Sequence, residues 1–139
     1  MNAIMNNLED LSKQLGVTEP WNEKGGVYWL ASDTLNVRVL ANVLNAWHAR
    51  FVTITAFQLP DDEGIRCEYH WDLDGRLLGF TFLVSGTPID SIFNLCEAAD
   101  WIEREIHEYY AVDFQGRDYE PLFLHTGDKL GVNMREEDE

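Results

Sequence analysis

Two stretches in the middle of the chain alternate between apolar and polar residues, and this pattern restricts the fold more than any other feature of the sequence. In residues 65–73 the alternation is strict, as expected of a strand with one buried and one exposed face. Asp74-Gly75 follows, a strong two-residue hairpin turn. Residues 76–84 return with apolar side chains at every second position from Leu78. The sequence therefore predicts a β-hairpin at the centre of the fold.

Further strands are expected on either side of this hairpin. Residues 51–58 are rich in β-branched and aromatic side chains, and an acidic turn at 61–64 joins them to the hairpin, which completes a β-meander. A short strand is expected at Val27–Leu30, after Gly25-Gly26.

Helical spacing of apolar residues predicts three helices. The first covers residues 3–15 and stops at Gly16. The second is capped by Ser32 or Asp33. Its apolar stripe consists of Leu35, Val39, Leu40, Val43, Leu44 and Trp47. The third covers about 95–111, and short extended segments follow it.

Because helices and strands occur in mixed order around a hairpin core, the predicted fold class is a two-layer α+β domain with a central β-meander. Its 139 residues suit one domain, 1–139, which ends in an acidic tail at 136–139.

The charge of the chain excludes some partners and favours others. The net charge is −15, with 25 acidic residues against 10 lysines and arginines that form no basic stripe. Such a chain is unsuited to nucleic acid or to anionic lipid, and it favours a basic protein partner. There is no apolar run near the roughly 18 residues of a membrane span, and the N-terminus does not resemble a signal peptide, so we expect a cytoplasmic protein. Cys67 and Cys96 are expected to be buried, small apolar residues.

Residues 99–117, ADWIEREIHEYYAVDFQGR, concentrate charges next to aromatic residues. At about 100° per residue, the apolar side chains of the predicted helix fill one arc and the charged ones fill the opposite arc. The charged arc contains Asp100, Glu103, Arg104, His107 and Glu108. We expect this arc to be exposed, with Glu105 on the flank of the apolar face.

Three interpretations of this charged helix can be compared. Glu103 and His107 have the i, i+4 spacing of metal ligands, but no matching pattern supplies the third and fourth ligands of a site. Pairing of Arg104 with Asp100 and Glu108 would contribute only a few tenths of a kcal/mol, roughly, for exposed pairs.

Catalysis by a partly buried Glu105 lacks a neighbouring nucleophile with a base, and the sequence has no GxGxxG, GxxxxGK or HExxH motif. Aromatic residues and arginine are typical anchors of protein interfaces, so a surface that binds another protein fits best.

The same stretch resembles the signature of the 30-kilodalton-subunit family of respiratory complex I, NADH–quinone oxidoreductase, which also occurs in energy-converting nickel–iron hydrogenases. The family pattern is E-R-E, two residues, an acid, two apolar or aromatic residues, six residues, a basic residue, and a short apolar strand. The matching positions are Asp100, Trp101, Glu103, Arg104, Glu105, Glu108, Tyr109, Tyr110, Arg117, Pro121 and Leu124. Arg117 stands where the family usually has histidine or lysine. The GVNMRE sequence at 131–136 fits the family's glycine–arginine–acid ending.

This resemblance implies a mixed, mostly antiparallel sheet with helices packed on one side. It implies a non-catalytic subunit without a cofactor, which binds the large catalytic subunit (quinone-site or Ni-Fe) and a neighbouring iron–sulfur subunit. The protein would then be peripheral on the inner face of the cell membrane, through its complex. The expected partner-binding residues are Asp100, Trp101, Glu103, Arg104, Glu105, Glu108, Tyr109, Tyr110 and Arg117. The chain stops soon after the signature, which favours the hydrogenase branch over the complex I branch.

Two alternatives from other classes stay open. An acidic inhibitor or mimic that blocks a basic partner, such as a nuclease, is compatible with the net charge and predicts carboxylates gathered on one face. A small independent enzyme using Glu105, His70 or Cys67 would need activity in the isolated chain.

Overall fold

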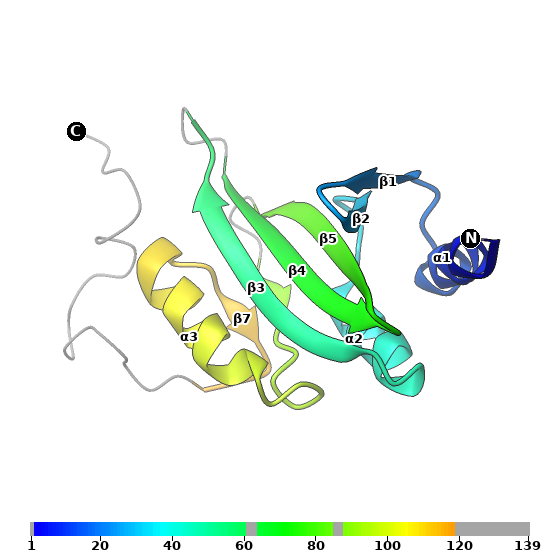
Figure 1. Cartoon of the computed structure of the whole chain (residues 1–139). Coiled ribbons are helices and arrows are strands. Elements are labelled where there is room, and N and C mark those ends of the chain that lie inside the picture. Colours follow the sequence, from blue (N-terminus) through cyan, green and yellow to red (C-terminus); the bar gives the residue numbers. More distant parts are fainter. Residues whose placement is uncertain (1, 61–63, 85–87, 119–139) are drawn as a thin grey trace.

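The computed structural model describes residues 2–60, 64–84 and 88–118, with the side chains of residues 2–6 left out. Three helices and seven strands occur in mixed order along this part of the chain, and Figure 1 shows their arrangement. In chain order they are α1 (Asn2–Leu15), β1 (Trp21–Lys24), β2 (Val27–Ala31), α2 (Val37–Ala46), β3 (Arg50–Gln58), β4 (Ile65–Leu73), β5 (Arg76–Val84), β6 (Ile89–Asp90), α3 (Ala99–Tyr110) and β7 (Phe114–Gln115).

Five strands form one sheet in the order β1-β2-β5-β4-β3. Only β2 and β5 pair in parallel, and the other three pairs of this sheet are antiparallel. The short strands β6 and β7 form a separate parallel pair. The fold is therefore α+β with a mixed, mostly antiparallel sheet and a central meander of β3, β4 and β5, as predicted.

The central hairpin has the predicted strand bounds and turn. Leu73 of β4 pairs with Arg76 of β5, which leaves Asp74 and Gly75 as the two turn residues. Both have positive φ angles, 52° and 82°, as a type I′ turn requires. Buried and partly buried residues alternate without interruption along β4. The apolar residues of the sequence pattern therefore lie on the buried face of the sheet and the polar ones on the other face, as predicted.

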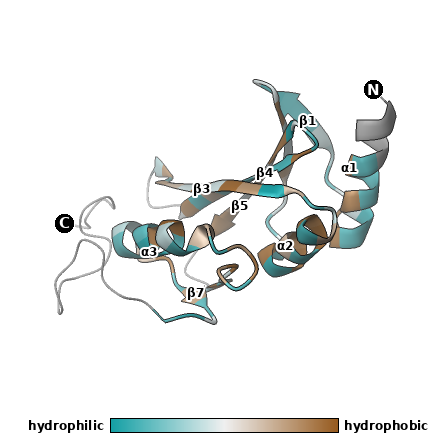
Figure 2. Ribbon diagram, turned by 60° about the horizontal axis from the view of Figure 1, so that its bottom comes forward, coloured by the Kyte–Doolittle hydropathy of each residue, from teal (hydrophilic) through white to brown (hydrophobic). Residues whose placement is uncertain are grey.

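The core lies between the inner face of the sheet and the helices. Figure 2 shows α2 and α3 on the same side of the sheet. Trp71 of β4 is fully buried and lies edge-on to Phe51 of β3 and Phe80 of β5, with ring centroids 5.3 and 5.9 Å apart. Leu40 and Leu44 of α2 are fully buried in the same core cluster. Packing of aromatic rings against helix side chains thus joins the two layers.

The other face of the sheet carries a close contact that explains a glycine inside β5. Trp29 of β2 lies opposite Gly79, and a Cβ added at Gly79 would lie 2.5 Å from the Trp29 ring. The Trp29 ring also stands edge-on to His70 at 5.1 Å. Burial lowers the pKa of His70 below its ordinary value, so the imidazole is kept neutral on this face.

The first half of the chain differs from the sequence prediction in three respects. Strand β1 was not predicted, and Gly25-Gly26 is the turn between β1 and β2. Helix α2 starts at Val37 with Asn36 as its N-cap, so the prediction of a Ser32 or Asp33 cap was wrong. Val39, expected in the apolar stripe, is 40% exposed.

Helix α3 is shorter than the predicted 95–111. Hydrogen bonds from the amides of Leu95 and Cys96 to the carbonyl of Ile92 form tight turns before the helix begins. The helix ends where Ala111 adopts a left-handed conformation with φ 57°. The predicted extended segment after the helix is confirmed as β7, whereas β6 was not predicted.

No helix in the described part of the chain is long and apolar enough to cross a membrane. Several predictions lie outside the described residues. They concern the acidic turn at 61–63, the family positions Pro121 and Leu124, the ending at 131–136 and the acidic tail at 136–139.

Candidate functional site

The charged helix α3 does not turn its polar arc to the solvent as a whole. Glu103 has no exposed surface and Glu108 is 4% exposed, although both were expected on the exposed side. The prediction for this arc was wrong because it considered the helix alone. The segments on either side, 91–97 and 111–117, cover part of the charged arc and supply polar partners to it.

The Glu103 carboxylate is enclosed by three hydrogen-bond donors. The Ser91 hydroxyl donates to Oε1 at 2.6 Å, and the backbone N–H of Ile92 donates to Oε2 at 2.8 Å. Nη1 of Arg117 donates to Oε1 at 3.1 Å. These contacts join α3 to the segments before and after it. A buried carboxylate is tolerated only with such partners.

Arg117 connects the same helix to the chain beyond β7. Its Nη2 donates to the Asp100 carboxylate, and its Nη1 donates to the Asp100 backbone carbonyl at 3.2 Å. The guanidinium carbon lies 5.2 Å from the centre of the Phe93 ring. The side chain is only 4% exposed. Arg117 is thus a buried cation held by Asp100, Glu103 and the Phe93 ring. We name the Arg117 network the set formed by Arg117, Asp100, Glu103, Ser91, the Ile92 amide and Phe93.

Burial and ion pairing act in opposite directions on this network. Burial raises the pKa of Glu103 above its ordinary value, although the bonds from Ser91, Ile92 and Arg117 limit the rise. Burial alone lowers the pKa of Arg117, but the bonds to Asp100 and Glu103 outweigh it, and the pKa is raised. The cation is therefore permanent at any working pH, and the network is a fixed structural element.

Outside this network, α3 presents an aromatic residue to the solvent. Trp101 is 53% exposed, which is more than any other large apolar side chain among the described residues. The Arg104 guanidinium stacks on it, with Cζ 5.4 Å from the ring centre, and Nε of Arg104 lies 3.7 Å from the Asp100 carboxylate. The Arg104 side chain is 17% exposed, so of the two stacked groups only the Trp101 ring is largely in solvent. Asp100 therefore links the Trp101–Arg104 pair to the buried Arg117.

The other predicted site residues on α3 differ in how far they are buried. Glu105 and Tyr109 are partly buried, whereas Glu108 and Tyr110 are buried. Nδ1 of His107 lies 2.8 Å from the carbonyl oxygen of Val112. This ring nitrogen therefore bonds to the backbone and does not form a ligand pair with Glu103, four residues earlier. In the described ranges, no group of three or more histidine, cysteine and acidic residues could hold a metal ion.

Sequence reasoning missed the residues that complete the Arg117 network. Ser91 and the Ile92 amide come from a segment that was treated only as a link, and Phe93 was not singled out. No local pattern marks them, because their role depends on contacts with residues 11 to 24 positions further along the chain.

The geometry is suited to holding a helix in place. The Ser91 hydroxyl is committed to Glu103 and is 4% exposed, so a substrate cannot reach it. The exposed ring of Trp101 and the partly buried Arg104 guanidinium stacked on it are residue types typical of protein interfaces.

The fold and the site together define a small α+β protein in which the buried Arg117 network holds the charged helix α3 in place. The chain matches the family described as "Respiratory-chain NADH dehydrogenase, 30 Kd subunit" over residues 30–137. It belongs to this family, as the resemblance in the sequence indicated. Members are subunits of multi-subunit respiratory complexes, so the chain is an accessory subunit of such a complex and other subunits are its partners.

Two solved structures have the same fold. The first is the trypsin-resistant fragment (1–134) of Nqo5, with a TM-score of 0.64 and 17% sequence identity, covering 84% of this chain and 98% of that one. The second belongs to the membrane-bound sulfane sulfur reductase, an archaeal respiratory membrane complex. Its TM-score is 0.70 at 15% identity, covering 88% of this chain and 78% of that one. No curated protein matches the chain in sequence.

Proposed function

We propose that the chain is a cofactor-free accessory subunit of a membrane-associated oxidoreductase complex, of the NADH–quinone oxidoreductase or energy-converting hydrogenase type. It binds the large catalytic subunit, with an iron–sulfur subunit next to it, and reaches the inner face of the membrane only through the complex. Family membership supports the class of complex. The second fold match comes from a respiratory membrane complex, which is in keeping with this assignment.

The exposed Trp101 ring with the partly buried Arg104 stacked on it is the observation that carries the docking proposal. A tryptophan that is 53% exposed leaves a large apolar area in water, and a partner surface would bury it. The stacked Arg104 guanidinium is already oriented, so it loses little conformational freedom when it binds a carboxylate or carbonyl of the partner. Asp100, Glu105 and Tyr109 lie on the same helix and extend the surface.

The buried members of the predicted site have a different role in this proposal. Glu103, Glu108 and Tyr110 are buried, and the Arg117 side chain is almost fully enclosed. They hold α3 in the orientation that presents Trp101, in place of the direct partner contacts expected from the sequence. A helix held in one position binds with a smaller entropic cost than a mobile one.

Purification of the tagged full chain from its native membranes, with mass spectrometry of the recovered proteins, tests the proposal. The wild-type chain is expected to recover a large quinone-site or Ni-Fe subunit, and the identity of that subunit distinguishes the two branches. Trp101→Ala and Arg104→Ala are expected to lower this recovery at least tenfold, because interface anchors contribute about 2 kcal/mol or more.

Two matched variants control for loss of an exposed aromatic or cationic side chain elsewhere. Phe57→Ala removes a ring that is 41% exposed on β3, and Arg38→Ala removes an exposed arginine of α2. Both should recover the partner like the wild type. Recovery of a basic nuclease, or of nothing from membranes that contain the complex, would overturn the proposal. Equal losses in all four variants would show that α3 is not the docking surface.

A further inference from the structure

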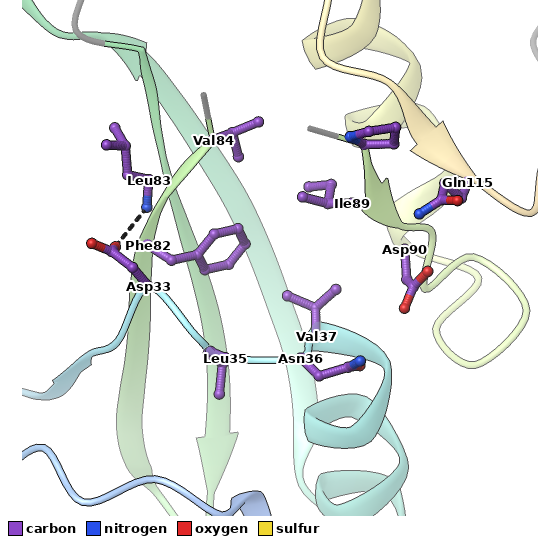
Figure 3. Close-up of a pocket in the computed structure, with 11 residues that line it drawn as sticks. Asp33, Leu35, Asn36, Val37, Phe82, Leu83, Val84, Ile89, Asp90 and Gln115 are labelled. Atoms are coloured by element: carbon purple, nitrogen blue, oxygen red, sulfur yellow. Dashed lines mark hydrogen bonds between the residues drawn. The ribbon is translucent and has the colours of Figure 1, made fainter. Parts of the chain in front are cut away.

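A surface pocket of about 290 Å³ lies between three parts of the fold. None of its lining residues belongs to α3, the helix that carries Trp101. Its walls come from the segment 33–37 that leads into α2, from the end of β5, and from the β6–β7 pair. Figure 3 shows these three parts around the pocket. The volume is at the lower end of the roughly 300–1,000 Å³ typical of ligand sites, so the pocket suits one side chain better than a large cofactor.

The inner walls of the pocket are apolar. Val37 of α2 and Phe82 of β5 are buried and face it together with Ile89 of β6 (Figure 3). This lining suits the methylene groups of a long side chain, which gain free energy when they leave water.

The charged groups of the pocket are carboxylates alone. Asp33 and Asp90 line it from opposite sides, and none of the described lining residues is a lysine or an arginine (Figure 3). Oδ1 of Asp33 accepts a hydrogen bond from the Leu83 amide at 3.0 Å, so this carboxylate is partly used. Asp90 is partly buried, and its carboxylate makes no hydrogen bond or ion pair with any described residue. Among the residues that the structure describes, this carboxylate therefore has no cation partner.

Other polar groups near the pocket do not cancel this charge. The Asn36 side chain is occupied, because its oxygen accepts bonds from the amides of Arg38 and Val39. The amino end of α2 contributes about half a positive charge, which is less than the two carboxylates together. The neutral amide of Gln115, on the strand paired with β6, adds hydrogen-bonding capacity.

We propose that this pocket receives a lysine or arginine side chain of a neighbouring subunit, with its stem along Val37, Phe82 and Ile89 and its charged end on Asp90. The proposal rests on the proposed function for the existence of that subunit. An apolar wall that ends in a carboxylate with no partner in the described ranges matches the two parts of a basic side chain. The net charge of −15 attracts basic surfaces and favours the same partner chemistry.

The chemistry of the pocket can be tested on the isolated full chain. The ¹⁵N-labelled protein is titrated with n-butylguanidinium and n-butylammonium, with n-butanol as the uncharged control. Saturable shifts are expected for the amides of Ile89, Asp90 and Gln115 with the two cations and not with n-butanol. Asp90→Asn should abolish them, and Asp10→Asn, which removes an exposed carboxylate of α1, should leave them unchanged.

Two results of this titration would overturn the pocket proposal. One is an equal response of wild type and Asp90→Asn to the organic cations. The other is saturation by Mg²⁺ at lower concentration than by n-butylguanidinium, because that would identify a simple cation site.

The role in assembly is tested by charge reversal in the native-membrane purification. Asp90→Arg is expected to reduce recovery of the large subunit at least tenfold, and Asp10→Arg to leave it unchanged, with thermal unfolding as the check on folding. Equal recovery by wild type and Asp90→Arg would overturn the pocket proposal and leave the proposed function standing. If the wild-type chain recovers no such subunit, the proposed function fails, whereas an Asp90-dependent response in the titration still supports the preference for a basic group.

Discussion

At the scale of single residues, Arg117 determines how α3 is held. It reaches back to Asp100 and Glu103, 17 and 14 positions earlier in the chain, and its own side chain is 4% exposed. Burying a cation and a carboxylate costs free energy that their mutual attraction must offset. The pair is retained because the hydroxyl of Ser91 and the amide of Ile92 also satisfy Glu103.

Arg117→Met is expected to lower the free energy of unfolding by about 3–5 kcal/mol at pH 8, because it leaves the Glu103 carboxylate buried without its cation. The deficit should shrink at pH 5. Burial raises the pKa of Glu103 above its ordinary 4.5 and Arg117 limits that rise, so the folded variant, which lacks Arg117, takes up a proton on Glu103 more readily than the wild type. The stability linked to this group is fully present below pH 4.5 and is lost as the pH rises through the raised pKa.

Urea denaturation of the wild type and Arg117→Met at pH 5 and pH 8 measures this difference. Arg38→Met, at an exposed arginine of α2, is the matched control and should change stability by less than about 0.5 kcal/mol. A deficit that is the same at both pH values would show that Glu103 does not take up a proton when Arg117 is lost.

Sequence reasoning singled out both Glu103 and Arg117 but not their contact. The family resemblance marked them as members of one motif, and the helical pattern placed Glu103 on an exposed arc. That placement failed because a helical wheel contains no information on segments outside the helix. Trp101, which the resemblance marked as a partner-binding residue, is 53% exposed.

At the scale of elements, the start of α2 shows how two local signals compete. Ser32 and Asp33 have the chemistry of N-caps, but the Ser32 hydroxyl contacts the Thr34 hydroxyl, and the Asp33 carboxylate bonds to the sheet. The Ser32 amide donates to the carbonyl of Thr81, and Asp33 accepts from the Leu83 amide, which continues the pairing of β2 with β5. Asn36 is the residue that caps the helix, and its side chain accepts from the amides of Arg38 and Val39.

Asn36→Ala is expected to destabilise the protein by about 1 kcal/mol, because two amides of the first helical turn lose their acceptor. Asn36→Asp should retain most of the stability. Asn42→Ala, at an exposed position within α2, should be neutral or slightly stabilising, since alanine has the higher helix propensity. Thermal unfolding of the three variants compares them directly, and equal losses in Asn36→Ala and Asn42→Ala would contradict the cap assignment.

Elements with strong periodicity were predictable and short ones were not. Strands β4 and β5 were predicted with their correct bounds, because nine residues of alternation and a type I′ turn admit one pairing. Strand β6 has two residues and β1 has four, of which three are exposed, so neither carries a pattern. Their strand geometry is imposed by the partners β7 and β2.

At the scale of the whole molecule, the fold contains a large sheet with its core and a smaller part made of α3, β6 and β7. Helix α3 contacts the large sheet at β3, and the Arg117 network ties it to the segment that follows β6. The two cysteines report on the two parts. Cys67 lies in the central strand β4 with no exposed surface, and Cys96 lies just before α3 and is 7% exposed.

Alkylation of these thiols with iodoacetamide at pH 8 is expected to modify Cys96 well before Cys67 in the native protein. Burial raises the pKa of Cys67 to about 12 and also raises that of Cys96, so each reacts only after local or global opening. Opening of the smaller part exposes Cys96, whereas Cys67 requires the central sheet to separate. Both should react at the same rate in denaturant.

Arg117→Met links this measurement to the buried network. Because the variant loosens α3 and leaves the central sheet intact, it should accelerate modification of Cys96 by a larger factor than that of Cys67. Mass spectrometry of peptides from timed samples gives both rates in one experiment. If the two rates rise by the same factor, the network stabilises the molecule as a single cooperative unit, and the smaller part does not open independently. The helix proposed to dock would then be as rigid as the sheet beneath it.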